Sequence, residues 1–338
     1  MLDKVTEKIS KAFEVEKVPF RRNLSTEEMR KLQDACNRAF NSVIHIDIIE
    51  KIMDYCCYVE RNMKGRAAGN IEDMIIRYLI RFYASMQIEA ADNACHLEIG
   101  ALFGAATIFS CHAIRLSGKK NITVVIDPLE GYYGREKDLI TNLPVDENTF
   151  WSNIERFGYS KDMIEVKKGY SDDENILKLV KNYQILSLLI DGDHSYEGVK
   201  KDWLNYSPLV VTGGYVLIDD YNSYFWPDVS NFVNKEIISN LAGKWEVVLV
   251  FGNSIILKRT ELEEFEMLST NDVLFHQLKG MERKVQLGED ALRQRDELLR
   301  LNSEEIKSLK NEIKRLRNTW SWKLTSPLRY FYNLLKNN

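Results

Sequence analysis

Seven short apolar runs between residues 94 and 260 constrain the fold of this chain more than any other feature. In order they are ACHLEIG, NITVVID, MIEVKKG, ILSLLID, GYVLIDD, WEVVLVF and SIILKR. The first five are separated by helical segments and are apolar throughout, which is typical of parallel strands buried on both faces. A Gly252-Asn253 turn joins the last two and predicts an antiparallel hairpin. We therefore expect an α/β domain whose mostly parallel sheet has one late antiparallel strand.

Composition changes on both sides of these runs and divides the chain into four regions. The N-terminal region is rich in helix formers, and Ser25 with Glu28 has the spacing of a capping box, so we expect it to be helical. The sheet region is followed by a charged region without proline and then by a short aromatic tail. The predicted boundaries are 1–90, 91–260, 261–318 and 319–338.

The charged region has a heptad pattern. Apolar residues recur every seven positions, at Leu278, Val285, Leu292, Leu299, Ile306 and Ile313. The matching positions three residues further on are polar near the middle, where Asn302 is suited to set the register. The pattern predicts a coiled coil that forms a homo-oligomer through residues 270–318. The alternative is a single solvated helix with ion pairs between residues four apart.

The tail, residues 319–338, contains no acidic residue and mixes tryptophan, tyrosine and phenylalanine with lysine and arginine. Such a mixture is typical of segments that lie in the interface of an anionic bilayer. We therefore expect peripheral membrane contact through this tail, at the inner face of the cytoplasmic membrane. The alternative is a tail that packs on its own domain.

Composition argues against several classes of protein. The formal net charge is −4, from 46 basic and 50 acidic residues, so no nucleic acid partner is expected. Five cysteines without a CxxC pair argue against a disulfide framework or a zinc site and favour a cytoplasmic protein. The charged first residues lack the apolar core of a secretory signal. No apolar run reaches the ~18 residues that span a bilayer.

Polar residues that carry chemistry follow the first three predicted strands. Glu98 ends the first strand, and Gly100 and Gly104 follow with the spacing ExGxxxG, which permits a tight turn and close approach of a ligand. Asp127 ends the second strand, where an acid can accept both ribose hydroxyls of a nucleoside. Ser171 and Asp172 follow the third strand. A structural turn and helix N-caps are the alternatives for these motifs.

Three aspartates end the fourth and fifth predicted strands. Asp191 follows the fourth strand, and Asp219 and Asp220 follow the fifth. Neighbouring parallel strands end at the same edge of a sheet, so three carboxylates meet there and repel each other unless a cation joins them. Oxygen ligands favour Mg²⁺ or Ca²⁺ over zinc. An EF-hand loop is excluded, because Tyr196 stands where that loop needs glycine. The alternative is that some of these acids only cap helices.

Together these motifs resemble a known family. ExGxxxG, the acid after the second strand, IDGDHSYEGVKKD and GGYVLIDDYN look like the class I S-adenosylmethionine-dependent methyltransferases. Within that class they are similar to metal-dependent O-methyltransferases of macrolide and aminocoumarin sugars (macrocin-O-methyltransferase-like) and to the cephalosporin-hydroxylase-like group. The resemblance covers residues 94–260. It implies a Rossmann-like seven-stranded sheet of order 3-2-1-4-5-7-6 with strand seven antiparallel.

The resemblance also implies a role for each motif. The ExGxxxG residues would line the methionine part of S-adenosylmethionine, Asp127 would hold its ribose, and Ser171 with Asp172 would lie near its adenine. The three aspartates would bind Mg²⁺. His194 stands three residues after the first of them, where catechol-type relatives have a lysine base. A histidine can act as a general base, but this one can also orient Asp191 or the substrate.

The implied reaction is direct methyl transfer from S-adenosylmethionine to a sugar hydroxyl, with Mg²⁺ chelating two neighbouring sugar oxygens. The terminal SWKLTSPLR resembles a tail motif of bacterial enzymes that build surface polysaccharides, and it points to a glycan or its lipid-linked precursor as substrate. One alternative is methylation of a small antibiotic sugar. Another is a coiled-coil scaffold of a polysaccharide assembly complex, with a domain that only binds cofactor. An oxidative enzyme is disfavoured, because the sequence shows no evident iron-binding histidine set.

Overall fold

The computed structural model describes residues 23–89, 94–131, 134–138, 140–241, 243–260 and Lys307. Apart from Lys307, the predicted coiled coil and the predicted tail lie outside the described residues. Among the described residues, no helix combines the length and the apolarity that a membrane-spanning segment needs.

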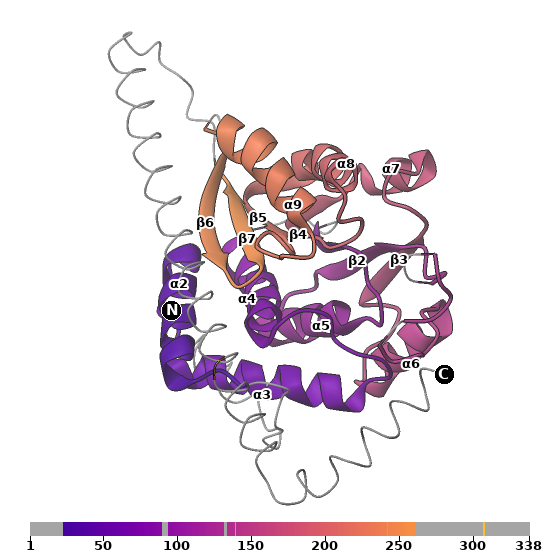
Figure 1. Ribbon diagram of the computed structural model, residues 1–338, viewed down its shortest axis with the longest axis horizontal. Coiled ribbons are helices and arrows are strands. Elements are labelled where there is room, and N and C mark those ends of the chain that lie inside the picture. The colour runs from indigo at the N-terminus through magenta and orange to yellow at the C-terminus, as the bar shows by residue number, and fades with distance from the viewer. Residues whose placement is uncertain are drawn as a thin grey trace, which may run out of the picture. The chain divides into compact units, whose positions relative to one another are not determined.

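A seven-stranded sheet forms the centre of the domain (Figure 1). Its strands, in chain order, are β1 (Ala94–Ile99), β2 (Ile122–Asp127), β3 (Ile164–Lys168), β4 (Gln184–Ile190), β5 (Val210–Ile218), β6 (Trp245–Phe251) and β7 (Ser254–Arg259). Their spatial order is β3-β2-β1-β4-β5-β7-β6. The first five pair in parallel, whereas β7 is antiparallel to both β5 and β6. The predicted fold class, strand order and antiparallel hairpin are confirmed, and the fold is that of a class I methyltransferase.

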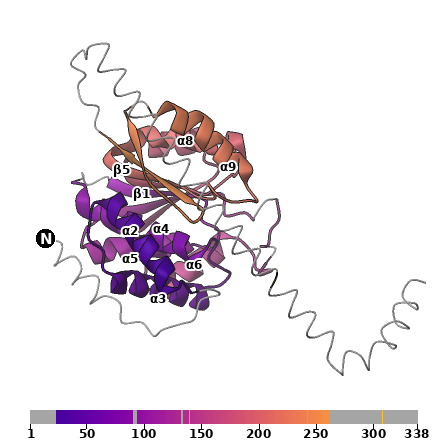
Figure 2. The same cartoon turned by 60° about the vertical axis from the view of Figure 1, so that its left-hand side comes forward.

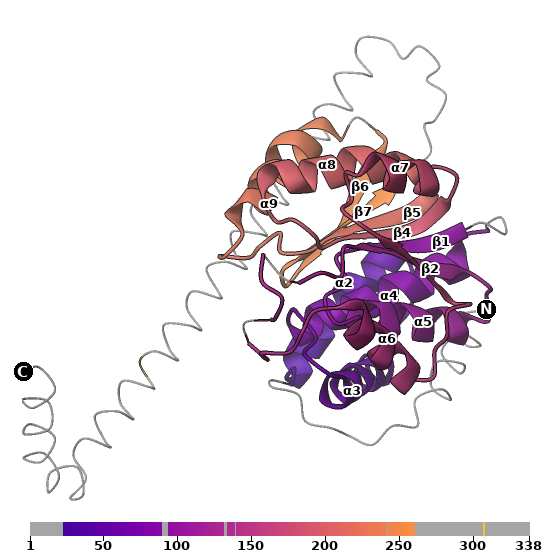
Figure 3. The same ribbon diagram turned by 90° about the vertical axis from the view of Figure 1, so that its right-hand side faces the viewer.

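Helices cover both faces of the sheet (Figures 2 and 3). One face carries α2 (Thr26–Phe40), α3 (Ile46–Asn62), α4 (Ile71–Gln87), α5 (Ala105–Ser117) and α6 (Glu147–Arg156). The other face carries α7 (Glu174–Val180), α8 (Tyr196–Tyr206) and α9 (Pro227–Phe232). Short helical turns follow α8 and α9, at Ser207–Leu209, Val233–Ile237 and Ile238–Asn240. The predicted capping box is confirmed, since Ser25 and Glu28 exchange hydrogen bonds at the start of α2.

Two apolar cores, one on each face, explain why the strand sequences do not alternate between apolar and polar residues. Along β5, Tyr215 and Leu217 pack in the core on the α4 side, whereas Val216 and Ile218 pack in the core on the α8 side. Successive side chains of a strand point to opposite faces. Both faces are covered, so every position in the run is apolar. The first polar residues after each buried strand therefore lie at the exposed carboxyl edge of the sheet.

Candidate active site at the carboxyl edge of the sheet

Gly100, in the ExGxxxG motif after β1, packs against the residue that follows β4. Its φ is +87°, and a Cβ atom at this position would lie 2.0 Å from the carbonyl oxygen of Asp191. The Asp191 amide donates to the carbonyl of Ile99 at 3.0 Å, so the chain after β1 and the chain after β4 pack backbone against backbone. A side chain would separate them, which makes glycine necessary here. The structural reading of this turn is confirmed, and the turn lies directly beside Asp191.

Asp127 contacts the glycine loop, and Glu98 contacts the helix that follows it. Asp127 accepts hydrogen bonds from the amides of Ala101 and Leu129, each at 2.7 Å. Glu98 is fully buried and accepts a hydrogen bond from the Thr107 hydroxyl at 3.1 Å. Burial raises the pKa of Glu98 to about 8, although Arg81 and Thr107 act in the opposite direction. Asp127 therefore contacts the glycine loop through Ala101, Glu98 contacts α5 through Thr107, and the predicted contacts of both residues to a cofactor remain predictions.

Ser171 and Asp172 both contact helix α8. The Ser171 hydroxyl donates to Asp202 Oδ1 at 2.5 Å, and Asp172 pairs with Lys201 at 2.8 Å. Asp202 is buried, which raises the pKa of its carboxyl to about 7, and its Oδ2 has no hydrogen-bond partner among the described residues. Sequence analysis overlooked Asp202 as a residue that fixes the loop after β3. The predicted adenine contacts of Ser171 and Asp172 remain predictions.

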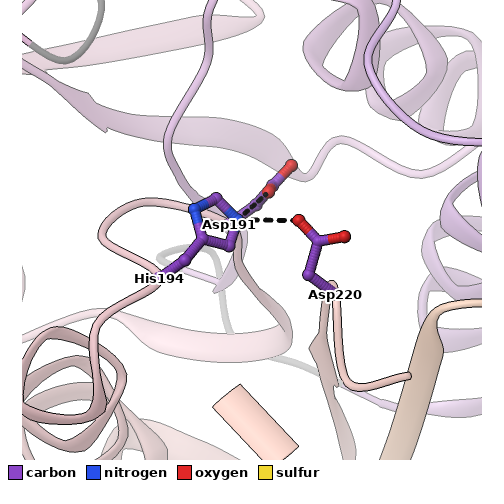
Figure 4. A group of neighbouring side chains, drawn as sticks. All are labelled: Asp191, His194 and Asp220. Carbon is purple, nitrogen blue, oxygen red and sulfur yellow. Dashed lines mark ion pairs between the residues drawn. The ribbon is translucent and has the colours of Figure 1, made fainter. Parts of the chain in front are cut away.

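Asp191, His194 and Asp220 form a compact cluster at the ends of β4 and β5 (Figure 4). His194 Nε2 lies 3.3 Å from Asp191 Oδ1 and 3.1 Å from Asp220 Oδ2. One potential ligand atom from each residue lies within 4.8 Å of the other two. The far face of the imidazole is covered by Trp226, whose ring stacks on it at a centroid distance of 4.8 Å. Two of the three aspartates predicted to bind a cation therefore meet, and a histidine joins them.

The charge state of His194 follows from these neighbours. Burial by itself would lower the pKa of the imidazole, but Asp191 and Asp220 raise it to about 10. An imidazolium at neutral pH cannot accept a proton, so this arrangement favours His194 as a partner of the carboxylates over a free base. A divalent cation between the same carboxylates would compete with that proton and leave the nitrogen as a ligand.

Asp220 is placed by an unusual backbone. Its φ is +57°, a left-handed conformation that non-glycine residues rarely adopt. The next two residues fix it against the turn between β6 and β7. The Tyr221 amide donates to the carbonyl of Asn253 at 2.7 Å, and the Asn222 side chain donates to the carbonyl of Gly252 at 3.0 Å. The hairpin read from the sequence thus also orients a site residue.

Asp219 points toward helix α4, which carries Arg77. Neighbouring residues at a strand end diverge, so Asp219 follows Tyr215 and Leu217 toward α4. There its Oδ2 accepts a hydrogen bond from Arg77 Nη2 at 2.5 Å, and the same nitrogen lies 3.0 Å from Asp191 Oδ2. The compact cluster does not include Asp219. Its role as a cation ligand remains a prediction.

Arg77 is the residue that sequence analysis missed, because the N-terminal region showed no chemical pattern. Burial would lower the pKa of its guanidinium, but Asp219 and Asp191 raise it, so Arg77 stays charged. The signal was available in the apolar run IIRYLIRFY, where Arg77 and Arg81 stand four residues apart. Two arginines on the buried stripe of a helix require partners, and carboxylates at a sheet edge are suitable ones.

Asp193 does not face the cluster. Its carboxylate accepts hydrogen bonds from the Ser195 amide at 2.9 Å and the Ser195 hydroxyl at 3.0 Å. A Cβ atom at Gly198 would lie 2.4 Å from this carboxyl group. Asp193 therefore shapes the loop before α8, where Ser195 is the N-cap.

The cluster of Asp191, His194 and Asp220 suits a divalent cation. Two carboxylate oxygens and one imidazole nitrogen are accepted ligands of Mg²⁺, Mn²⁺ and related ions, and the imidazole extends the range beyond purely hard ions. A buried carboxylate oxygen beside the cluster, Asp219 Oδ1, has no hydrogen-bond partner among the described residues. The donor atoms are close enough together for a shared ion.

Comparison with known proteins agrees with this fold. Residues 97–221 match the family described as a methyltransferase domain, which extends from β1 to just beyond Asp220. Uncharacterized protein R132 of Acanthamoeba polyphaga mimivirus is 31% identical over 192 residues, which are 56% of this chain and 76% of the viral protein. The chain belongs to the same family as this viral protein. The methyltransferase domain of this chain is the sheet domain described above.

Solved structures of O-methyltransferases share similarity with the methyltransferase domain. The O-methyltransferase NovP is 17% identical, with 69% of this chain and 100% of NovP covered and a TM-score of 0.45. The calicheamicin methyltransferase CalS11 is 13% identical, with 70% and 94% covered and a TM-score of 0.45. An O-methyltransferase from Bacillus cereus is 15% identical, with 69% and 100% covered and a TM-score of 0.38. The fold assignment rests on the strand order observed in this chain.

Proposed function

We propose that this protein is an S-adenosylmethionine-dependent O-methyltransferase that uses a divalent cation, in the first instance Mg²⁺, and methylates a sugar hydroxyl. One observation carries the proposal. The ligand cluster of Asp191, His194 and Asp220 lies at the same sheet edge as the Gly100 loop, and Gly100 packs on the backbone of Asp191 itself. A methyl donor and a cation-bound hydroxyl need such closely spaced sites.

The proposed site has two parts, one for the methyl donor S-adenosylmethionine (the donor side) and one for the cation (the cation side). On the donor side, the loop from Gly100 to Gly104 follows β1, and Asp127 anchors it through the Ala101 amide. This is the position at which open α/β sheets bind nucleosides. On the cation side, Asp191, His194 and Asp220 would hold the ion. When bound, the cation would lower the pKa of the acceptor hydroxyl, and S-adenosylmethionine would supply the methyl group.

The protein contributes mainly orientation to this reaction. The backbone contact at Gly100 fixes the distance between the two sides, and Trp226 holds the imidazole plane of His194. The hydrogen bonds of Tyr221 and Asn222 to the β6–β7 turn hold Asp220 in its left-handed conformation. Groups fixed in this way stabilise a transition state without first reorganising.

Exposed aromatic residues beside the cluster support a sugar acceptor. Tyr224 and Phe225 are 92% and 82% exposed, and they directly precede Trp226, which stacks on His194. Aromatic side chains are typical of binding sites for small organic ligands, and their ring faces suit the apolar face of a sugar. We propose that the acceptor belongs to a bacterial surface glycan or its lipid-linked precursor, which the predicted basic tail would meet at the membrane.

A transfer assay tests this proposal. The full-length protein is incubated with S-adenosylmethionine labelled in its methyl group, Mg²⁺ or Mn²⁺, and lipid-linked or free glycan acceptors. We expect label in the glycan, none after treatment with EDTA, and a loss of at least a hundredfold in Asp191→Ala. Transfer that is indifferent to both EDTA and Asp191→Ala would exclude the cation mechanism.

A further inference from the structure

Arg77 and Asp219 form a buried pair directly behind the ligand cluster. We propose that this pair positions Asp191 for the cation, and that Asp219 acts through Arg77 and is not itself a cation ligand. The inference rests on the proposed function, because it assigns a role at the same cation site. Arg77 is thus a positioning residue on a helix outside the matched methyltransferase domain.

The geometry divides the two oxygens of Asp191 between two tasks. Asp191 Oδ2 lies 3.0 Å from Arg77 Nη2, and Asp191 Oδ1 lies 3.3 Å from His194 Nε2. A carboxylate held at one oxygen by a fixed guanidinium presents its other oxygen in a defined direction. Residues that hydrogen-bond to a metal-ligating side chain commonly orient it in this way, and their loss weakens metal binding about 10–100-fold. Arg77 therefore aims Asp191 at the cluster.

The Asp219 carboxyl group pairs with Arg77. Its Oδ2 lies 2.5 Å from Arg77 Nη2, its side chain is 7% exposed, and it follows the α4 face of β5. Its Oδ1 has no hydrogen-bond partner among the described residues, a feature that suits a ligand role. The two roles predict different results when Arg77 is removed, as described below.

Helix α4 is fixed on both sides of Arg77. One turn earlier, Asp73 accepts hydrogen bonds from the Asn253 amide at 3.0 Å and the Ser254 hydroxyl at 2.8 Å. One turn later, Arg81 donates to the Ser187 hydroxyl at 3.0 Å. These contacts to β4 and the β6–β7 turn leave the helix little freedom to rotate or slide. A guanidinium carried by so constrained an element can serve as a fixed point.

A double-mutant cycle on cation affinity tests the inference. Mn²⁺ binding to the full-length protein, without cofactor or acceptor, is measured by titration for wild type, Arg77→Met, Asp219→Asn and the double variant. We expect each single change to weaken Mn²⁺ binding by about tenfold or more, and the double variant to bind no more weakly than Arg77→Met. If the two losses multiply, Asp219 binds the ion directly and the inference is overturned.

Controls separate this result from misfolding. Arg66→Met removes another arginine that pairs with a buried carboxylate, Asp138, but lies outside α4, and we expect its Mn²⁺ affinity to stay within about twofold of wild type. If Arg77→Met does not fold by circular dichroism, the cycle is run with Arg77→Lys, which keeps the charge but not the planar guanidinium. Absence of Mn²⁺ binding by folded wild type would overturn the cation of the proposed function and the inference with it.

Discussion

Asp220 combines a strained backbone with a place in the proposed cation cluster. Its φ of +57° lies in a region where strain of about 1–3 kcal/mol is retained mostly at functional sites. The bonds from Tyr221 and Asn222 to the β6–β7 turn maintain this conformation. The strain is therefore part of how the carboxylate reaches His194.

Replacing Asp220 by asparagine separates charge from conformation. Asparagine keeps the size and tolerates the left-handed region, so we expect thermal stability close to that of wild type. The lost charge removes a ligand, so Mn²⁺ affinity measured by titration falls at least tenfold. Unchanged affinity in Asp220→Asn would remove this residue from the cation site.

Gly100→Ala is expected to be strongly destabilising. The new Cβ would lie 2.0 Å from the carbonyl oxygen of Asp191, and that atom belongs to a backbone that cannot move aside without opening the sheet edge. We expect chemical denaturation to show a loss of more than about 3 kcal/mol. Gly158→Ala is the matched control, because Gly158 also has positive φ (+73°) but open space around it, and we expect a cost of about 1 kcal/mol. Equal costs for the two changes would refute the close approach.

Glu98 is expected to make stability depend on pH. Burial raises the pKa of this carboxyl to about 8 in the folded protein, so the folded state keeps a proton that the unfolded state loses near pH 4.5. The free energy of unfolding therefore falls as pH rises from about 4.5 to about 8. In Glu98→Gln this contribution is absent, and we expect the free energy of unfolding of the variant to gain on the order of 5 kcal/mol relative to wild type between pH 4.5 and pH 8. Parallel denaturation profiles for the two proteins would contradict this.

Among the elements, α4 carries a polar column on its buried face. Asp73, Arg77, Arg81 and Ser85 stand four residues apart, and all four are buried. Ser85 bonds to His96 at 2.8 Å, and the other three bond to strands, turns or site residues as described above. The apolar periodicity of this segment predicts the helix. It does not specify where the helix lies along the sheet, which is set by the partners of these four side chains.

The loop between β5 and α9 is predicted to bind the acceptor. Replacing both Tyr224 and Phe225 by alanine removes two exposed rings without disturbing Trp226 or the core. We expect KM for the glycan acceptor to rise about tenfold, with Mn²⁺ affinity and S-adenosylhomocysteine affinity unchanged. Leu204→Ala on α8 serves as the control, since Leu204 is also exposed, at 58%. An unchanged KM in the double variant would place the acceptor elsewhere.

At the scale of the whole molecule, the strand order was predictable because each buried strand is an unbroken apolar run with a polar residue at its end. For the same reason, Asp191 and Asp220 could be predicted to lie close together at the sheet edge. The position at a strand end does not distinguish Asp219 from Asp220, although strand alternation sends the former toward α4. The part played by Arg77 was not predictable, because contacts between α4 and the sheet join residues far apart in the chain.

The regions outside the described residues allow a test of the scaffold alternative. We expect a protein lacking residues 261–338 to retain cofactor binding and methyl transfer to a soluble acceptor, and to lose both self-association in ultracentrifugation and binding to anionic vesicles. Glycan assembly that survives a site variant such as Asp191→Ala but fails on this truncation would instead favour a scaffold.

The central claim is that the cluster of Asp191, His194 and Asp220 binds a cation required for methyl transfer. Its most direct test is transfer from methyl-labelled S-adenosylmethionine to glycan acceptor, measured as a function of Mg²⁺ or Mn²⁺ in wild type and in Asp220→Asn. We expect saturable dependence on the cation in wild type, with half-saturation shifted at least tenfold upward in the variant. Full transfer by metal-free wild type, with the same rate in Asp220→Asn, would contradict it.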